Sequence, residues 1–229
     1  MKPALFETTG AGFVFENKGE HRNVMNIGRQ LKSLRMFVLP ACALLLFMGG
    51  GHSVNAQRSI EQRLTERASQ ITGDSFPVST RTPRGVRVYA RTQPNASVLR
   101  AIDDGLTELF AVARRHGYRA RLEHTAYTVY IARADRDKDS SGNYSPDIAV
   151  AAGQYAGSGY DQGGFIYAAG MVLAYNPCAF IIAEHQRDFG RISNVVRYEG
   201  EHLVLYYNDR QLYERTADHS RGGGHPILQ

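Results

Sequence analysis

Hydrophobic residues recur along residues 97–116 at the spacing of one helix face. Asn95, just before this segment, is a residue type that caps helix N-termini, and Gly117 follows it where helices commonly end. The apolar positions step by three or four residues and are Val98, Leu99, Ile102, Leu106, Leu109, Phe110 and Ala113. The pattern predicts a long helix over 97–116 that packs on another layer by its apolar face.

Alternation replaces this periodicity in the segments on either side of that helix. Residues 85–90 place Val86 and Val88 on one face, as a strand does. Residues 126–134 are β-branched or aromatic on both faces, and they predict a strand buried on both sides. Residues 164–177 also have strand character, and they end at an Asn-Pro pair.

The other segments have weaker patterns. Residues 57–84 predict a short helix and then a linker rich in Pro and Thr. Residues 135–147 predict a polar loop, and the glycines between 153 and 164 suit a hairpin or a surface loop. Residues 178–186 fit either a short helix or a buried connection, and Ser193 starts a last helix. This order of strands and helices predicts an α+β fold, with a small mixed sheet beneath the packing helix.

A run of 13 residues without charge, MFVLPACALLLFM at 36–48, stands out near the N-terminus. Cationic residues precede it, and Val54 and Ala56 follow as small residues at signal-peptidase spacing. The run is shorter than the roughly 20 residues of a membrane span. We therefore predict a signal peptide at 25–56, cleaved near Ala56, and a secreted or periplasmic protein with no stable membrane span; an uncleaved anchor is the alternative. Residues 1–24 are then an upstream misreading of the gene or a disordered extension.

Charge and cysteine content narrow the classes of function. The chain has a formal net charge of +5 and a sequence pI near 9.3. Residues 1–56 carry six Lys/Arg against three Asp/Glu, so much of this excess lies in the leader. No basic stripe with interleaved aromatic residues is present, which argues against nucleic-acid binding. Cys178 is the single cysteine after the leader, so no intrachain disulfide can form, and its apolar neighbours predict burial.

The segment NVVRYEGEHLVLYYND at 194–209 carries the residues with chemical potential. On a helix, one arc of about 100° gathers a polar seam beside Val195. An ordinary amphipathic helix would not place glutamate, histidine and two tyrosines so near its apolar side. The polar seam consists of Tyr198, Glu199, His202, Tyr206 and Asp209. It is a candidate site for metal binding or proton transfer.

YEGEH at 198–202 resembles the H-E-x-x-H motif of zincin metallopeptidases with one letter changed. In that pattern two histidines one turn apart bind Zn²⁺, and the glutamate beside the first is the general base. The order of strand, long helix, strand, further strands and motif helix is also similar to a zincin over about residues 85–207. The resemblance implies a zincin-like domain at 85–229, in which Glu199 is the catalytic base and His202 is a metal ligand.

Tyr198 occupies the first ligand position, where the zincin pattern has histidine. Tyrosine binds a metal only as phenolate, and its unperturbed pKa is near 10, so a zinc site needs further ligands. His219 and His225 lie in the C-terminal tail, where GGGHP is flexible enough to fold back over the helix. The candidate Zn²⁺ ligands are therefore His202, Tyr198, His219 and His225.

Two functions from different classes follow. The first is an exported zinc-dependent hydrolase that acts on a peptide or protein substrate. The second is a non-catalytic secreted domain with the same fold and a binding or structural role, in which Tyr198 packs where the metal was lost. In that second case the acidic residues Glu199, Glu201 and Asp209 pair with Arg197 or Arg210.

A weaker metal site is suggested by aspartates near residue 137. Asp135, Asp137 and Asp139 have the 1, 3, 5 spacing of calcium loops. Ser140 and Pro146 stand where an EF-hand requires Gly and Glu. A solvated surface turn therefore explains this segment better than a Ca²⁺ site.

Overall fold

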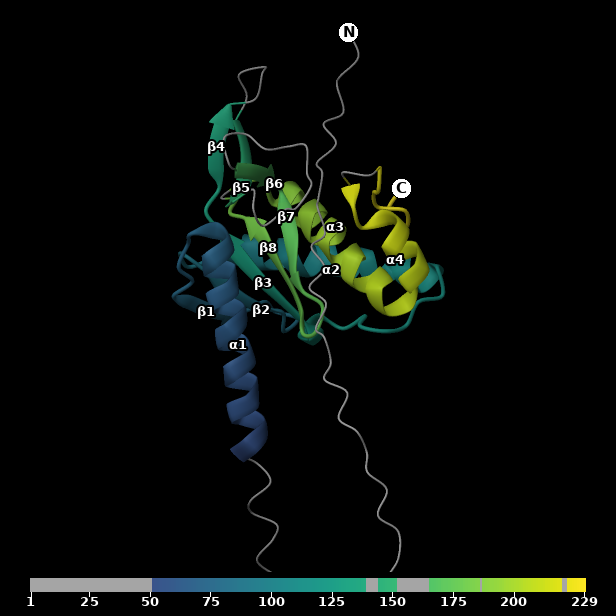
Figure 1. Ribbon diagram of the computed structural model, residues 1–229, viewed down its shortest axis with the longest axis horizontal. Helices are drawn as coiled ribbons and strands as arrows, with labels where there is room; N and C mark the ends of the chain where they lie inside the picture. The colour runs from purple at the N-terminus through teal and green to yellow at the C-terminus, as the bar shows by residue number, and fades with distance from the viewer. Residues whose placement is uncertain (1–50, 139–143, 152–164, 186, 220–221) are drawn as a thin grey trace, which may run out of the picture. The chain divides into compact units, whose positions relative to one another are not determined.

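The computed structural model describes residues 51–138, 144–151, 165–185, 187–219 and 222–229, and Arg63–Gln229 fall in one compact unit (Figure 1). The helices are α1 (Gly51–Thr72), α2 (Ala96–Arg115), the 3₁₀ turn η1 (His124–Ala126), α3 (Phe189–Asn208) and α4 (Arg210–Thr216). The strands are β1 (Val78–Arg81), β2 (Arg87–Ala90), β3 (Tyr127–Ala132), β4 (Asp135–Lys138), β5 (Tyr144–Ala151), β6 (Phe165–Ala168), β7 (Gly170–Ala174) and β8 (Cys178–Ala183). Within the described residues, no helix has the length and apolar character needed to cross a membrane. The apolar run at 36–48 lies outside them, so the signal peptide stays a prediction.

A mixed five-stranded sheet forms the centre of the fold, with strand order β1-β2-β3-β8-β7. Strands β2, β3 and β8 are parallel to one another, whereas β1 and β7 run antiparallel at the two edges. Strands β4, β5 and β6 form a second, antiparallel sheet. The α+β class and the mixed sheet are thus confirmed.

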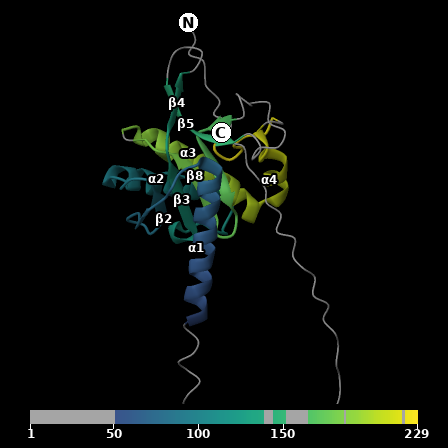
Figure 2. The ribbon, with the colours of Figure 1, turned by 60° about the vertical axis from the view of Figure 1, so that its left-hand side comes forward.

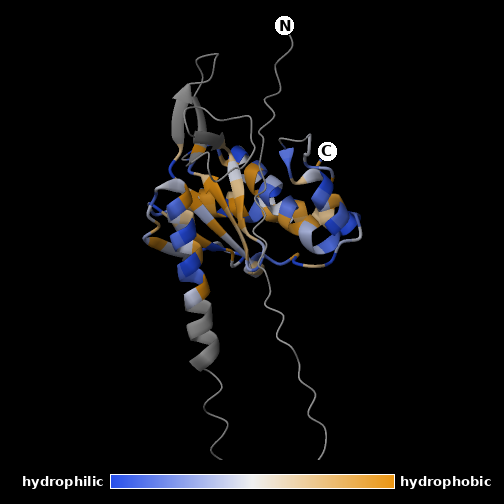
Figure 3. Ribbon diagram, in the orientation of Figure 1, coloured by the Kyte–Doolittle hydropathy of each residue, from blue (hydrophilic) through white to orange (hydrophobic). Residues whose placement is uncertain are grey.

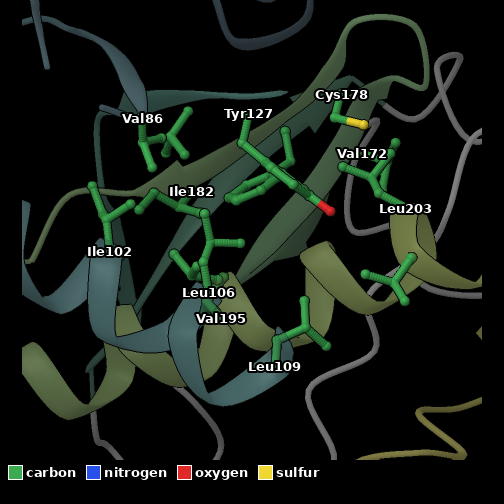
Figure 4. Packing of buried hydrophobic residues seen from close by; sticks show 14 of the residues in the cluster. Val86, Ile102, Leu106, Leu109, Tyr127, Val172, Cys178, Ile182, Val195 and Leu203 are labelled. Carbon is green, nitrogen blue, oxygen red and sulfur yellow. The ribbon is translucent and has the colours of Figure 1, made fainter. Parts of the chain in front are cut away.

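The central strand β3 is buried on both faces, as its sequence predicts. Tyr127 (labelled in Figure 4) and Val129 belong to the cluster made with α2 and α3. Tyr130 belongs to a second cluster that includes Ala68 and Ile71 of α1. Successive side chains of a strand point to opposite faces, so one apolar segment serves two layers. Figure 3 accordingly shows hydrophobic residues concentrated in the central strands.

Helix α2 matches the predicted helix at 97–116 closely. The Asn95 side chain accepts hydrogen bonds from the N–H groups of Ser97 and Val98, both at 2.9 Å. Gly117 has φ 84°, in the left-handed region that favours glycine after a helix. Local sequence signals therefore set both ends of this helix.

Helices α2 and α3 approach each other closely because glycines face the contact. A Cβ on Gly105 of α2 would lie 2.5 Å from the Ser193 carbonyl oxygen of α3. A Cβ on Gly200, the glycine of YEGEH, would lie 2.6 Å from Leu109 Cδ2. Gly200 thus has a packing role that offsets its cost of about 1 kcal/mol within a helix.

Strand β8 corrects the prediction for residues 178–186. The sequence left a short helix or a buried connection open there, but Cys178–Ala183 form a central strand, parallel to β3 and antiparallel to β7. A short, uniformly apolar run has no periodicity that separates strand from helix. The predicted linker after α1 likewise contains edge strand β1, and α3 begins at Phe189, four residues before the predicted start.

The predicted polar loop at 135–147 is also wrong, because its described residues form the hairpin strands β4 and β5. Asp135 pairs with Asp147 and Asp137 pairs with Ser145 in an antiparallel ladder. Two of the three aspartates of the weak calcium candidate therefore lie in an extended strand, not in a loop that wraps an ion. The third, Asp139, lies outside the described residues, as do the glycines between 153 and 164.

Candidate metal centre

Helix α3 buries three polar residues of the motif region. The side chains of Glu199, Glu201 and His202 are 2%, 0% and 1% exposed. A Cβ on Gly170 would lie 2.8 Å from Glu199 Cγ, so the backbone of edge strand β7 passes directly over this glutamate. Glu199 and His202 of the polar seam are thus enclosed, whereas Tyr198, Tyr206 and Asp209 are half-buried.

The C-terminal tail folds back against α3, as GGGHP predicts (Figures 1 and 2). After α4, the Gly224 N–H donates to the Thr216 carbonyl at 3.0 Å, and the Gly223 N–H donates to the Asp218 carbonyl at 3.1 Å. A Cβ on Gly223 would collide with the Thr216 carbonyl oxygen, and Gly222 has φ 81°. These glycines therefore permit the tight return that carries His225 to the helix.

This return brings together three histidines from separate parts of the chain. Ligand atoms of His202, His219 and His225 all lie within 4.8 Å of one another. The ring centroids are 5.1 Å apart for His202 and His219, 5.0 Å for His202 and His225, and 4.7 Å for His219 and His225. Three of the four metal ligands considered from the sequence thus form one histidine cluster.

The ring nitrogens of the histidine cluster are available to a ligand. Both nitrogens of His202, Nε2 of His219 and Nε2 of His225 are buried and have no hydrogen-bond partner within the described part of the chain. Buried polar atoms are nearly always paired, so four unpaired nitrogens in one cluster indicate a site for something else. A bound cation is the simplest partner for several imidazole lone pairs that converge.

Burial keeps two of these rings neutral. Loss of solvent lowers the pKa of His202 well below its ordinary value, and the neighbouring His225 and His219 lower it further. Burial and His225 lower the pKa of His219 to about 4, although Asp218 and a hydrogen bond with the Gly224 backbone act in the opposite direction. Neutral imidazole is the form that binds metals, so these two rings are ready as ligands at neutral pH.

Glu199 has the opposite shift for the same reason. Burial raises the pKa of its carboxyl group from 4.5 to about 8. Its Oε2 has no hydrogen-bond partner among the described residues. Because a nearby cation favours the ionised form of a carboxyl group, a metal at the histidine cluster would lower this pKa.

Glu201 is the member of the site that sequence reasoning missed. Its Oε2 is hydrogen-bonded to Nδ1 of His225 at 2.9 Å, and its Oε1 accepts a hydrogen bond from the Ile227 N–H at 2.8 Å. The predicted pairing with Arg197 or Arg210 is wrong, because Arg197 pairs with Glu108 and Arg210 with Glu214. The helical wheel placed Glu201 outside the polar seam, and no sequence signal reveals that the tail covers that side.

The tyrosine of YEGEH lies beside the histidine cluster. The Tyr198 and His225 rings stack with centroids 4.5 Å apart and an interplanar angle of 25°. Tyr198 therefore packs against a candidate ligand, and its own role as a ligand stays a prediction. The other two seam residues have structural contacts: Tyr206 stacks on Tyr175 at 4.2 Å, and Asp209 caps α4.

Two further features lie apart from the histidine cluster. Cys178 is buried, as predicted, and burial raises the pKa of its thiol to about 12, so it is not a nucleophile near neutral pH. A pocket of about 290 Å³ is lined by Asn95, Val98, Ile131 and Glu184 among others, near the start of α2. No residue of the histidine cluster lines that pocket.

Comparisons with known proteins assign no family to this geometry. No family model, no curated protein and no solved structure matches the chain. The resemblance to zincins therefore rests on the YEGEH motif and the order of elements, and it stays a prediction.

Proposed function

We propose that this protein is a zinc-dependent hydrolase in which His202, His219 and His225 hold the metal and Glu199 is the general base. The observation that carries the proposal is the convergence of three buried or half-buried histidines, four of whose ring nitrogens lack partners in the described chain. A set of histidines kept only for packing would leave several polar atoms unsatisfied at a cost in stability.

The donor set fits zinc. Catalytic zinc sites use three protein ligands, often histidines, and leave a fourth position open. A Zn–N distance of about 2.0–2.1 Å separates tetrahedral ligand nitrogens by about 3.4 Å. The observed separations, all within 4.8 Å, would need to contract by at most about 1.4 Å.

The burial of Glu199 on the same helix as His202 supports a role as the general base. A zinc ion bound here would supply Lewis acidity toward a substrate carbonyl group and a water molecule. The ionised Glu199 carboxylate would take the proton from the attacking water and return it to the leaving amine. Its position one turn before His202 and beneath strand β7 supports a reaction at the edge of the sheet.

The resemblance to zincins extends the proposal to the substrate. The order β2, α2, β3, then β7, β8 and α3, with a mixed sheet, is compatible with that architecture. Zincin metallopeptidases cleave peptide bonds, so we propose a peptide or protein substrate for this site.

A non-catalytic domain is the second candidate. It is favoured by the stacking of Tyr198 on His225, which fills the place of one zincin ligand with an aromatic ring. In that case the histidine cluster would bind metal for stability alone, or would bind none.

The first experiment measures metal in the purified full chain after zinc supplementation and dialysis. We expect about one zinc ion per chain, by analogy with three-histidine catalytic sites. His202→Ala should lose the metal, whereas His116→Ala should keep it, because His116 is exposed and lies outside the histidine cluster. Absence of stoichiometric zinc from the native chain would overturn the proposal.

The second experiment separates the two candidates by hydrolysis of fluorescently labelled casein. Glu199→Gln should retain zinc and lose at least about 100-fold in rate, because general bases contribute 10²–10⁴-fold. Glu214→Gln is the matched control, since that side chain is exposed and pairs with Arg210. A zinc-loaded protein with no activity on casein or mixed peptides would favour the non-catalytic domain.

A further inference from the structure

The Glu201 side chain is buried in an unusual way for a carboxylate. It is fully enclosed, and within the described residues its side-chain partner is His225, with no salt bridge to an arginine or lysine. Burial of a charge is costly unless hydrogen bonds satisfy it. Both of its oxygens are hydrogen-bonded to the tail, one to the His225 side chain and one to the Ile227 backbone N–H.

These two bonds fix both the position and the proton of the His225 ring. The Ile227 side chain is buried in the cluster made with α2 and α3, and its backbone N–H holds the tail next to Glu201. A carboxylate only accepts hydrogen bonds, so Nδ1 of His225 must carry the proton. In the neutral ring, Nε2 then bears the lone pair, and Nε2 is the nitrogen that has no partner in the described chain.

We propose that Glu201 is a positioning residue that selects the Nδ1–H tautomer of His225 and so makes the C-terminal tail a ligand arm of the metal centre. The metal in this statement rests on the proposed function, whereas the tautomer and the docking of the tail do not. Carboxylates that hold ligand histidines in this way strengthen metal binding, and their loss commonly costs 10–100-fold in affinity.

Glu201→Gln tests the proposal sharply, because the two side chains have nearly the same shape. The amide oxygen can still accept from the Ile227 N–H, but the amide nitrogen can only donate toward His225. Nδ1 of His225 would then accept that bond, and the ring proton would move to Nε2. The tail should stay docked while the ligand nitrogen is blocked.

The direct measurement is ¹⁵N NMR of the histidine rings in the metal-free full chain at about pH 8, above the ordinary histidine pKa of about 6.5. We expect His225 to carry its proton on Nδ1 in the native protein and on Nε2 in Glu201→Gln, with Glu214→Gln unchanged. A native His225 with a proton on Nε2 overturns the proposal, whether or not the variant folds.

Zinc affinity, measured by competition with a chelator, is the second readout. We expect Glu201→Gln to bind zinc 10–100-fold more weakly than the native chain and Glu214→Gln to bind equally well. An unchanged affinity in a variant whose tautomer has switched would overturn the positioning role. If the native chain binds no zinc, the proposed function fails, and the tautomer measurement still decides the role of Glu201.

Discussion

Helices α2 and α3 have the same length and pack side by side on one face of the sheet, yet they bury different chemistry. Each has 20 residues. The buried residues of α2 are apolar or glycine apart from Asp103, whose Oδ2 accepts a hydrogen bond from the Arg84 N–H at 3.0 Å. Helix α3 buries Glu199, Glu201 and His202 within three positions of one another.

This contrast indicates that α2 serves mainly to build the core, whereas α3 also carries the candidate site. In α2, Asp103 holds a neighbouring loop through Oδ2 and leaves one buried oxygen, Oδ1, without a partner in the described chain, while the rest of the buried face fills the core. In α3 one side serves the same core, while Glu199 and His202 keep buried atoms without partners in the described chain. Unpaired polar atoms lower stability, so their concentration on one helix marks the side of the fold where a ligand is expected.

The largest difference in the free energy of unfolding should appear when the buried acids Glu199 and Asp103 are replaced by their amides in metal-free protein. Burial raises the pKa of Glu199 from 4.5 to about 8, so between these values the folded state binds more protons than the unfolded state. Stability is therefore lost as the pH rises from about 4.5 through 8. Glu199→Gln should remove this loss and stabilise the protein by several kcal/mol at about pH 9.

Asp103→Asn is the control on α2, and it should destabilise the protein by about 1 kcal/mol because it weakens the bond from Arg84. Urea unfolding of both variants between about pH 4.5 and 9 checks the prediction. A native protein whose stability does not fall over that range would contradict the environment inferred for Glu199.

Zinc should raise the stability of the protein only when the histidine cluster beside α3 is intact. At a free concentration of 100 times its Kd, a ligand that binds only the folded state adds about 2.7 kcal/mol. Thermal unfolding should report this increase for the native chain and for His124→Ala, because His124 contacts Thr107 of α2 instead of the histidine cluster. The increase should vanish in His219→Ala, and an equal response of both variants would place the metal elsewhere.

Replacement of the two glycines between α2 and α3 by alanine should change the stability of the protein by different amounts. Gly105→Ala should destabilise the protein by about 2 kcal/mol, because its Cβ would press on a backbone oxygen that cannot move independently. Gly200→Ala should change stability by less than about 1 kcal/mol, because its contact is the flexible end of Leu109 and alanine favours a helix. Urea unfolding of the two variants measures both effects, and the reverse order would contradict the packing described.

The helix caps should give the smallest difference. Asn95 accepts two N–H groups at the start of α2, whereas Asp188 accepts one, that of Arg191, at the start of α3. Asn95→Ala should cost about 1 kcal/mol. Asp188→Ala should cost less, and circular dichroism with urea unfolding would reveal an inverted order.

Local sequence patterns were sufficient to predict the helices and strands that hydrophobic spacing and capping residues define. The spacing of apolar residues with Asn95 and Gly117 predicted α2 nearly to its ends, and alternation predicted β2 and β3. Strand β8 was missed because a short apolar run fits either a helix or a strand. Strand β4 was missed because all four of its residues are charged, and the start of β5 was missed because Pro146 and Asp147 are residue types common in turns.

The sequence by itself determined that Glu199 and His202 share one face of a helix, since helical geometry relates positions three residues apart. It also indicated that the glycines before His225 would allow the tail to turn back. Only the tertiary structure decided that His219 and His225 reach His202 and that Glu201 faces the tail. The contact between Glu201 and His225 spans 24 positions of sequence. The path of the chain between them depends on packing against the whole core, which no local pattern records.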